Sequence, residues 1–229
     1  MPIPNYHLFL VNKLFIQVGQ LDSNTRKGNR AHSHIETFIV DNILTNVMAD
    51  INIQNIVASA SIADKLDLKR IEKVLPNTKY TPDIFPGLVL RLKELKATFL
   101  LFKSGKAVCT GAKTVEDIEK SIKEMMGMLS RAGFDVKDKP EINVHNIVAS
   151  GDLHGKLDLV ETAVNLGLEN VEYEPEIFPG MVYRRPDLGV VLLLFSSGRI
   201  VCTGAKRPEQ AFNAFSRIKK EMVERGLLY

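Results

Sequence analysis

The segment Ile51-Asn-Ile-Gln-Asn-Ile-Val-Ala-Ser59 returns 91 residues later as Ile142-Asn-Val-His-Asn-Ile-Val-Ala-Ser150. Three further motifs recur in the same order: KLDL at 65–68 and 156–159, IFPG at 84–87 and 177–180, and VCTGAK at 108–113 and 201–206. Two copies are too few for a solenoid, which needs three or more units to bury a continuous core. The duplication therefore predicts a pseudo-symmetric pair of units that share one sheet.

Each copy has the same predicted order of elements, which is strand, helix, four strands and helix. In the first copy GLVLRLK, ATFLLF and KAVCTG are typical of strands, and the apolar spacing of residues 64–75 indicates a short helix that ends at Pro76. Glycine in KSGK at 103–106 and in SSGR at 196–199 is typical of tight hairpin turns. The two copies together predict an α+β fold with one antiparallel sheet of about ten strands and four helices on one of its faces.

A long helix is predicted to close each copy, because apolar residues recur there at spacings of three and four. These residues are Ile118, Ile122, Met125 and Leu129 in the first copy, and Ala211, Phe215, Ile218 and Met222 in the second. Each helix then has one apolar face that can pack on the sheet. The opposite face of the sheet is expected to stay open.

Strand alternation predicts which side chains point toward the open face. In the first copy, Asn55 and Val57 point to one face of the sheet and Ile56 to the other. In the second copy, Asn146 and Val148 are separated from Ile147 in the same way. By the same alternation, Cys109 and Cys202 fall on the helix side of the sheet. We therefore interpret the two cysteines as small core residues.

The composition excludes several other classes of protein. The chain has 229 residues, of which 45% are hydrophobic and 25% charged, as is ordinary for a globular protein with a buried core. Its two cysteines are too few for a disulfide framework or a thiolate zinc site, and they favour a reducing, intracellular setting. No apolar run approaches the ~20 residues of a membrane span, and the N-terminal segment does not resemble a secretory leader.

Charge is distributed unevenly along the chain, whose formal net charge is +3. Residues 51–134 contain 14 Lys and Arg against 9 Asp and Glu, whereas residues 142–229 contain 10 against 11. A basic half and a slightly acidic half predict that a polyanion and a basic protein bind at different places on the molecule.

The motifs NIV, KLDL, YxPxxFPG, FxSGK/R and VCTGAK, each present twice in one order, resemble the core of the TATA-binding protein family. The resemblance covers about residues 51–229, and the short form is closer to archaeal members than to eukaryotic ones. It implies a saddle with helices on its convex face and a concave face that binds the minor groove of promoter DNA; this family is itself the standard example of minor-groove binding with a kink. It also implies a general transcription initiation factor that is not an enzyme and needs no cofactor.

The resemblance also implies which residues bind DNA. Two phenylalanines in each repeat would open base steps at the ends of the TATA element, and one asparagine in each would donate to the acceptors of A·T pairs near its centre. Apolar side chains and threonines would line the surface between them, while serines, lysines and arginines would lie near phosphates. The matching residues are Phe85, Phe102, Phe178 and Phe195; Asn55 and Asn146; Val57, Leu100, Val108, Thr110, Val148, Leu193, Val201 and Thr203; and Arg91, Ser104, Lys106, Lys113, Arg184, Ser197, Arg199 and Lys206.

Two positions depart from the family pattern. Ile84 stands where eukaryotic members carry an arginine, and Gly189 lacks the basic residue that Lys96 supplies in the first repeat. Each departure predicts one phosphate contact fewer.

The acidic residues Glu174 and Glu176 match the loop at which the transcription factor B family docks. The resemblance therefore implies three partners: double-stranded promoter DNA, a factor B protein, and RNA polymerase through the initiation complex. It places the protein in the archaeal cytoplasm or nucleoid, or in the nucleus of a eukaryote. A homodimer through the concave face is left open for the protein without DNA.

Two alternatives are weighed against this interpretation. One is a paralogue of the family that acts as a regulatory or architectural DNA-binding protein. The other is a metal-dependent phosphoesterase that uses Asp152 and His154 of the motif GDLHG. However, the first-repeat counterpart ASIAD lacks the glycines and the histidine, and no histidine follows His154 to complete a two-metal site. We interpret GDLHG as a turn between a strand and a helix, and Asp152 or a nearby polar group is expected to cap that helix.

The predicted boundaries are an N-terminal extension at 1–50, a first repeat at 51–134, a linker at 135–141 and a second repeat at 142–229. Residues 1–47 match nothing in the family core, and Met48 resembles the start of a short archaeal member. We interpret the extension as dispensable and as the product of an upstream start codon. The pair His32 and His34 within it is interpreted as solvent-exposed, and no metal site is predicted.

Overall fold

The computed structural model describes residues 51–229. The N-terminal extension, the proposed start near Met48 and the pair His32 and His34 lie outside the described residues. The first repeat contains β1 (Asn52–Ser61), α3 (Leu68–Val74), β2 (Thr78–Lys79), β3 (Leu88–Leu92), β4 (Ala97–Leu101), β5 (Lys106–Ala112) and α4 (Val115–Arg131). The second contains β6 (Ile142–Asp152), α5 (Leu159–Leu166), β7 (Val171–Glu172), β8 (Met181–Arg185), β9 (Val190–Leu194), β10 (Arg199–Ala205) and α6 (Pro208–Glu224).

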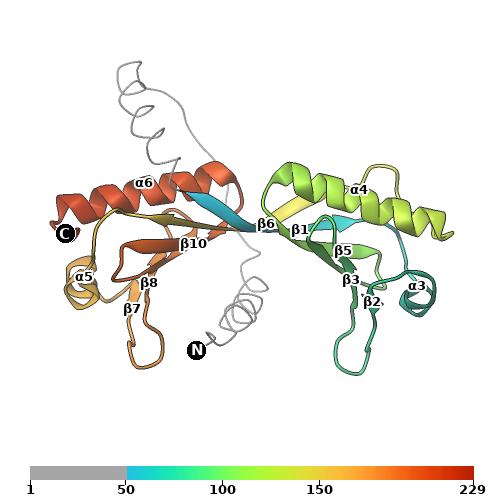
Figure 1. The fold of residues 1–229 in the computed structure, drawn as a ribbon, viewed down its shortest axis with the longest axis horizontal. Coiled ribbons are helices and arrows are strands. Elements are labelled where there is room, and N and C mark those ends of the chain that lie inside the picture. Colours follow the sequence, from blue (N-terminus) through green and yellow to red (C-terminus); the bar gives the residue numbers. More distant parts are fainter. Residues whose placement is uncertain (1–50) are drawn as a thin grey trace, which may run out of the picture. The chain divides into compact units, whose positions relative to one another are not determined.

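The ten strands form one antiparallel sheet in the order β2-β3-β4-β5-β1-β6-β10-β9-β8-β7. Each repeat contributes five neighbouring strands, and the two repeats meet where β1 pairs with β6. Figure 1 shows a curved sheet with the long helices α4 and α6 along one of its faces. The predicted α+β fold, with one sheet of about ten strands and four helices, is confirmed.

The long helices cover the sheet with the apolar faces that the sequence predicts. Their predicted contact residues are all at most 3% exposed: Ile118, Ile122, Met125 and Leu129 in α4, and Ala211, Phe215, Ile218 and Met222 in α6. Cys109 and Cys202 lie in the same core, and their burial raises the pKa of both thiols to about 12. The interpretation of the cysteines as core residues is therefore confirmed.

The short helices lie toward the two ends of the sheet, α3 beside β2 and α5 beside β7 (Figure 1). Helix α3 begins four residues later than the predicted range of 64–75, because the Asp67 carboxylate accepts a hydrogen bond from the backbone N–H of Arg70 at 3.1 Å. An aspartate that caps in this way sets the first residue of a helix. In the second repeat, Asp158 has the same role at the start of α5, and Asp152 does not cap this helix.

Hairpin turns join β4 to β5 and β9 to β10, as the glycines in KSGK and SSGR predict. Gly105 and Gly198 adopt φ angles of 77° and 83°, in the left-handed region that glycine enters most readily. A Cβ atom on Gly105 would also lie 1.9 Å from the carbonyl oxygen of Ala63, and one on Gly198 would lie 1.9 Å from that of Gly155. Both turns therefore require glycine for conformation and for space.

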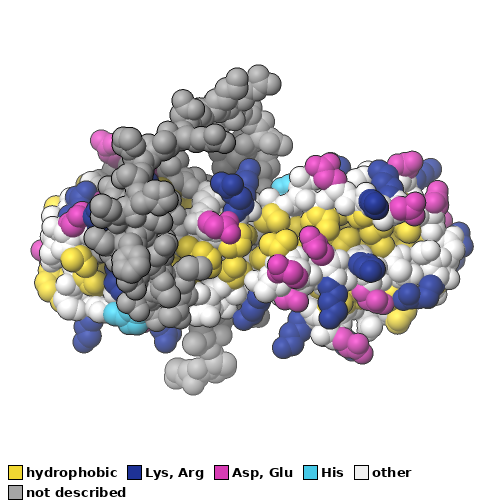
Figure 2. All heavy atoms as spheres, turned by 90° about the horizontal axis from the view of Figure 1, so that it is seen from above, with side chains coloured by type: hydrophobic (Ala, Val, Ile, Leu, Met, Phe, Trp, Pro, Cys, Tyr) yellow, Lys and Arg dark blue, Asp and Glu magenta, His cyan; other side chains and the backbone are white. Residues whose placement is uncertain are grey.

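On the helix-covered side, the half that holds α4 carries many charged side chains around a band of hydrophobic ones (Figure 2). Figure 2 shows Lys and Arg side chains interspersed with Asp and Glu over the half that holds α4. Such a mixture is typical of a solvated surface. No helix between residues 51 and 229 is long and apolar enough to cross a bilayer.

Candidate nucleic-acid interface

The open face is the face of the sheet opposite α4 and α6. On it, Val89 pairs with Leu100, Leu100 with Val108, and Val108 with Ser59. Residues paired directly across neighbouring strands point to the same face of a sheet, so these side chains form one row across the first repeat. The corresponding row in the second repeat is Val182, Leu193, Val201 and Ser150.

A second row lies two residues away along the strands. It contains Arg91, Thr98 and Thr110 in the first repeat, and Arg184, Val191 and Thr203 in the second. On the central strand pair, Asn55 lies opposite Val148 and Val57 lies opposite Asn146. The structure thus brings the strand residues that were predicted to bind DNA together on one continuous face.

The predicted DNA-binding residues do not include six members of these rows, namely Val89, Thr98, Val182, Val191, Ser59 and Ser150. Val89 is half-buried between Leu88 and Leu90, which are both 0% exposed. This alternation has the period of a strand with one buried face, and the sequence LVLRL displays it. The alternation alone would have been sufficient to find Val89.

Each central asparagine is fixed by the backbone of a neighbouring strand. Asn55 Oδ1 accepts a hydrogen bond from the N–H of Gly111 at 2.8 Å, and Asn146 Oδ1 accepts one from the N–H of Gly204 at 2.7 Å. The hydroxyl of the adjacent threonine lies 3.1 Å from Nδ2 of Asn55 and 3.2 Å from Nδ2 of Asn146. Each amide oxygen is thus occupied by a backbone donor, which fixes the orientation of the side chain. The NH2 group is then the part of each amide that is left to interact with a ligand, as a donor.

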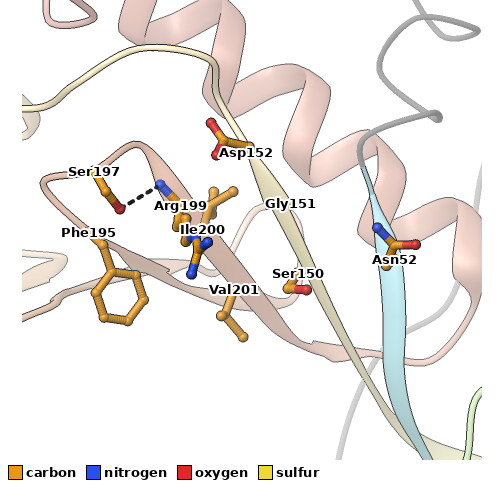
Figure 3. Close-up of a pocket in the computed structure, with 9 residues that line it drawn as sticks. All are labelled: Asn52, Ser150, Gly151, Asp152, Phe195, Ser197, Arg199, Ile200 and Val201. Carbon is orange, nitrogen blue, oxygen red and sulfur yellow. Dashed lines mark hydrogen bonds between the residues drawn. The ribbon is translucent and has the colours of Figure 1, made fainter.

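A pair of aromatic rings lies toward the outer part of each repeat. Phe85 and Phe102 have ring centroids 6.0 Å apart in an edge-to-face arrangement, and Phe178 and Phe195 have centroids 5.9 Å apart. All four rings are partly exposed. In Figure 3 the Phe195 ring and the Val201 side chain lie on the same side of the strand ends, while the Asp152 carboxylate points to the other side. Each pair offers an apolar ring of the size of a base.

The glycine after each FP dipeptide lies directly against these rings. A Cβ atom on Gly87 would lie 2.6 Å from a ring carbon of Phe85, and one on Gly180 would lie 2.7 Å from a ring carbon of Phe178 and 2.9 Å from one of Phe195. These distances are shorter than any van der Waals contact. The FPG motif therefore specifies the position of the rings.

The residues predicted to lie near phosphates are on the periphery of the open face. Seven of the eight are exposed: Arg91, Ser104, Lys106, Lys113, Ser197, Arg199 and Lys206. The eighth, Arg184, is partly buried and forms an ion pair with Glu172 at 2.9 Å. The position that corresponds to Glu172 in the first repeat is Lys79. The first repeat thus presents two cations where the second presents a neutralised pair.

The backbone explains why Gly189 departs from the family pattern. Lys96 and Gly189 occupy the same turn in the two repeats, with φ angles of 51° and 64°. The left-handed conformation is unfavourable for a residue with a Cβ atom. Glycine at 189 therefore suits this turn better than lysine does.

The loops at 80–87 and 173–180, here called the stirrup loops, have the same backbone hydrogen bonds. The carbonyl of Thr81 accepts from Ile84 and Phe85 at 3.0 and 2.9 Å, and that of Glu174 accepts from the two corresponding residues at 2.9 Å. Ile84 is 85% exposed at the position of the missing arginine, and Glu174 and Glu176 are exposed on the second loop. The two loops therefore differ in charge but not in this local conformation.

The GDLHG segment forms a strand end and a turn. Strand β6 continues through Asp152, whose Oδ1 accepts a hydrogen bond from the backbone N–H of His154 at 2.8 Å. Gly155 has no room for a side chain, since a Cβ atom would lie 2.6 Å from Leu228 Cγ. Within residues 51–229 no group of three or more His, Cys, Asp or Glu side chains is placed to hold a metal ion. Packing explains the motif without any metal site.

Comparison with known proteins connects this geometry to one family. The family model described as "Transcription factor TFIID (or TATA-binding protein, TBP)" matches residues 50–132 and 141–224. The TATA-box-binding proteins of Thermoplasma acidophilum and Archaeoglobus fulgidus are 52% and 51% identical to this chain over 178 residues, which cover 78% of this chain and 97% of each relative.

The solved structure of Methanococcus jannaschii TBP is similar to this chain with a TM-score of 0.71 and 45% sequence identity. The match covers 76% of this chain and 99% of that one. The family model matches both repeats of the chain. The single ten-stranded sheet with an open face agrees with this match. The chain belongs to the TATA-binding protein family.

Proposed function

We propose that this protein is a TATA-binding transcription factor, which binds the minor groove of promoter DNA with the open face of its sheet. The proposal rests on membership of a family of DNA-binding transcription factors. The observation that supports it most directly is the duplicated arrangement of two donor asparagines at the centre and two pairs of partly exposed phenylalanine rings farther out.

The chemistry of the open face suits A·T pairs. The minor groove of A·T pairs presents only acceptors, whereas a G·C pair adds the amino group of guanine. The amides of Asn55 and Asn146 can donate to these acceptors. The apolar side chains on the outer strands, such as Leu100 and Leu193, offer the guanine amino group no partner. Discrimination would therefore depend on A·T content and on the deformability of the DNA.

The phenylalanine pairs would deform the DNA. A ring inserted between two base pairs replaces part of the stacking that is lost when the step opens, which lowers the cost of a kink. The exposed lysines and arginines around the open face would neutralise phosphates and position the duplex without reading its sequence. These steps together would give a kinked TATA complex.

A bending assay tests this mechanism. Binding is measured by mobility shift on a TATA duplex and on a G·C duplex, and bending by fluorescence transfer between the duplex ends. We expect Phe178→Ala with Phe195→Ala to reduce both bending and TATA preference, while Phe212→Ala on α6 retains them. Wild-type levels of bending in the double variant would refute the assignment of the rings as wedges.

We further propose that the second stirrup loop binds a transcription factor B protein, which brings RNA polymerase to the promoter. Support comes from the exposed carboxylates of Glu174 and Glu176. The first loop has the uncharged Thr81 at the position of Glu174, so it carries one carboxylate fewer at these two positions. Charge reversal of both residues to lysine should abolish the factor B supershift on the TATA complex. The matched control is Asp83→Lys, which changes the charge at the position of Glu176 in the first loop.

A further inference from the structure

The short helix α5 exposes apolar side chains to the solvent. Val160 and Val164 are 65% and 71% exposed, and Leu168, which follows the end of the helix, is 75% exposed. Residues four apart lie on the same face of a helix, so the two valines are neighbours on its surface. A single exposed apolar residue is normal on a protein surface, but a group of them is typical of an interaction site.

The last residues of the chain extend this surface. The Tyr229 hydroxyl donates to the Glu161 carboxylate of α5, and the backbone of Tyr229 pairs with that of Lys156 at 2.9 and 3.1 Å. Arg225, which follows α6, donates to the backbone carbonyl of Asn165 on α5. Figure 1 shows α5 and the C-terminus at the same end of the sheet. Of the eight large hydrophobic residues that are exposed between residues 51 and 229, four belong to this surface, here called the α5 patch: Val160, Val164, Leu168 and Tyr229.

The fold does not require valine at these positions of α5. The aligned KLDL motifs place Lys69 and Lys73 of α3 at the positions of Val160 and Val164, and both lysines are exposed. The side of the helix that packs on the core is buried in both repeats, as Leu68 in α3 and its counterpart in α5 show. The two valines are therefore available for a contact outside the folded chain.

The surroundings of the α5 patch are acidic. Residues 157–183 contain six Asp and Glu and no Lys, Arg or His, whereas the corresponding residues 66–90 contain four Lys and Arg against three Asp and Glu. Glu161 lies on α5 itself and Glu169 follows Leu168, and both are exposed. Such a surface is complementary to an apolar face flanked by cations. It disfavours a polyanion, and it also disfavours a second copy of this chain, which would bring two sets of carboxylates together.

We propose that the α5 patch is a docking site for a basic amphipathic helix of a partner protein. The apolar face of that helix packs on Val160 and Val164, and its lysines or arginines pair with Glu161 and Glu169. No residue of the α5 patch belongs to the rows of the open face or to the second stirrup loop. The inference therefore does not depend on DNA binding or on factor B.

The test measures the binding of labelled peptides to the full chain by fluorescence anisotropy. The probe is a peptide of about 14 leucines and lysines, with the leucines at helical spacings of three and four. One control peptide has glutamate in place of lysine, and another has the composition of the probe in a shuffled order that gives no apolar face. We expect the wild type to bind the probe at least about tenfold more tightly than either control, because only the probe offers both an apolar face and cations.

Two variants locate the probe on the molecule. Val160→Lys with Val164→Lys introduces the residues of the first repeat, and it should weaken binding of the probe by at least about tenfold, since it removes apolar contacts and adds two positive charges. Val74→Lys makes the same change at a valine of α3 that is 50% exposed, and it should leave the affinity unchanged. Thermal unfolding checks that both variants keep the fold.

Three results would overturn the inference. One is equal affinity of the probe for the wild type and for Val160→Lys with Val164→Lys. Another is equal affinity of the wild type for the leucine–lysine and leucine–glutamate peptides, which would exclude a basic partner. The third is self-association of the wild type in sedimentation that the double variant abolishes, which would make a second copy the occupant. Mobility shift of the same proteins on a TATA duplex tests the proposed function separately, so either can fail while the other stands.

Discussion

The side-chain oxygen of Asn55 accepts a hydrogen bond from the backbone N–H of Gly111 at 2.8 Å. This bond leaves the amide NH2 group as the donor for DNA. Asn55→Asp keeps an oxygen for Gly111 but replaces the NH2 group with an acceptor. We expect a loss of about 1–3 kcal/mol in TATA binding, roughly 5-fold to 150-fold in Kd, because the acceptors of the groove would face a carboxylate. Fluorescence anisotropy on the TATA duplex measures the change.

The control for this variant is Asn213→Asp, which adds the same charge at an exposed position of α6. If both variants weakened binding equally, net charge would explain the effect and the donor role of Asn55 would be wrong. Thermal unfolding of each variant checks that the fold is retained.

The position of the wedge rings should depend on Gly180. Gly180→Ala would place a Cβ atom 2.7 Å from a ring carbon of Phe178, so the ring must move. We expect bending of the TATA duplex to fall and the free energy of unfolding to fall by about 1–3 kcal/mol, the usual cost of forced repacking. Fluorescence transfer between labelled duplex ends reports the bend.

A glycine elsewhere provides the matched control. Gly127 lies inside α4, where the nearest neighbour of a Cβ atom would be the flexible end of Arg131. Gly127→Ala should leave bending unchanged and raise the free energy of unfolding by roughly 0.5–1 kcal/mol through helix propensity. An unaltered bend in Gly180→Ala would show that the FPG glycine does not position the ring.

Much of the fold was predictable because the repeat imposes it. Duplicated motifs gave the number of strands and helices, and helical spacing identified the buried residues of α4 and α6 such as Ile118 and Ile218. The start of α3 was less predictable. The apolar spacing extends back into KLDL, before the helix begins, and only the capping bond of Asp67 sets the first helical residue. The ion pair between Arg184 and Glu172 depends on cross-strand register, which periodicity does not reveal.

The buried thiols predict a pH dependence of stability. Burial raises the pKa of Cys109 and Cys202 to about 12 in the folded protein, whereas an unfolded cysteine ionises near pH ~8.5. The folded state therefore binds more protons between these values, and the free energy of unfolding must fall as pH rises through this window. At pH values below this window, the contribution of the buried thiols to the free energy of unfolding is fully present. Denaturant unfolding of the wild type between about pH 8 and 11 should show this decline.

The double variant Cys109→Ala and Cys202→Ala isolates the contribution of the thiols, because other groups titrate equally in both proteins. It should have a shallower pH dependence than the wild type. In addition, the native thiols should resist alkylation at about pH 8 and react only after unfolding. Rapid alkylation of the folded protein would contradict their burial.

The asymmetry of charge between the repeats gives the last prediction. Glu172 neutralises Arg184 across 2.9 Å, while Arg91 and Lys79 at the equivalent positions are both cations. Glu172→Gln should free Arg184 for a phosphate, which strengthens TATA binding at low salt and steepens the slope of log K against log salt by up to about 0.9. An exposed ion pair contributes only about 0–1 kcal/mol to folding, so stability should change little. The control is Glu124→Gln, which breaks the exposed pair with Arg131 on α4. If Glu172→Gln keeps the wild-type salt slope, Arg184 gains no phosphate contact when its partner carboxylate is removed, and the prediction is wrong.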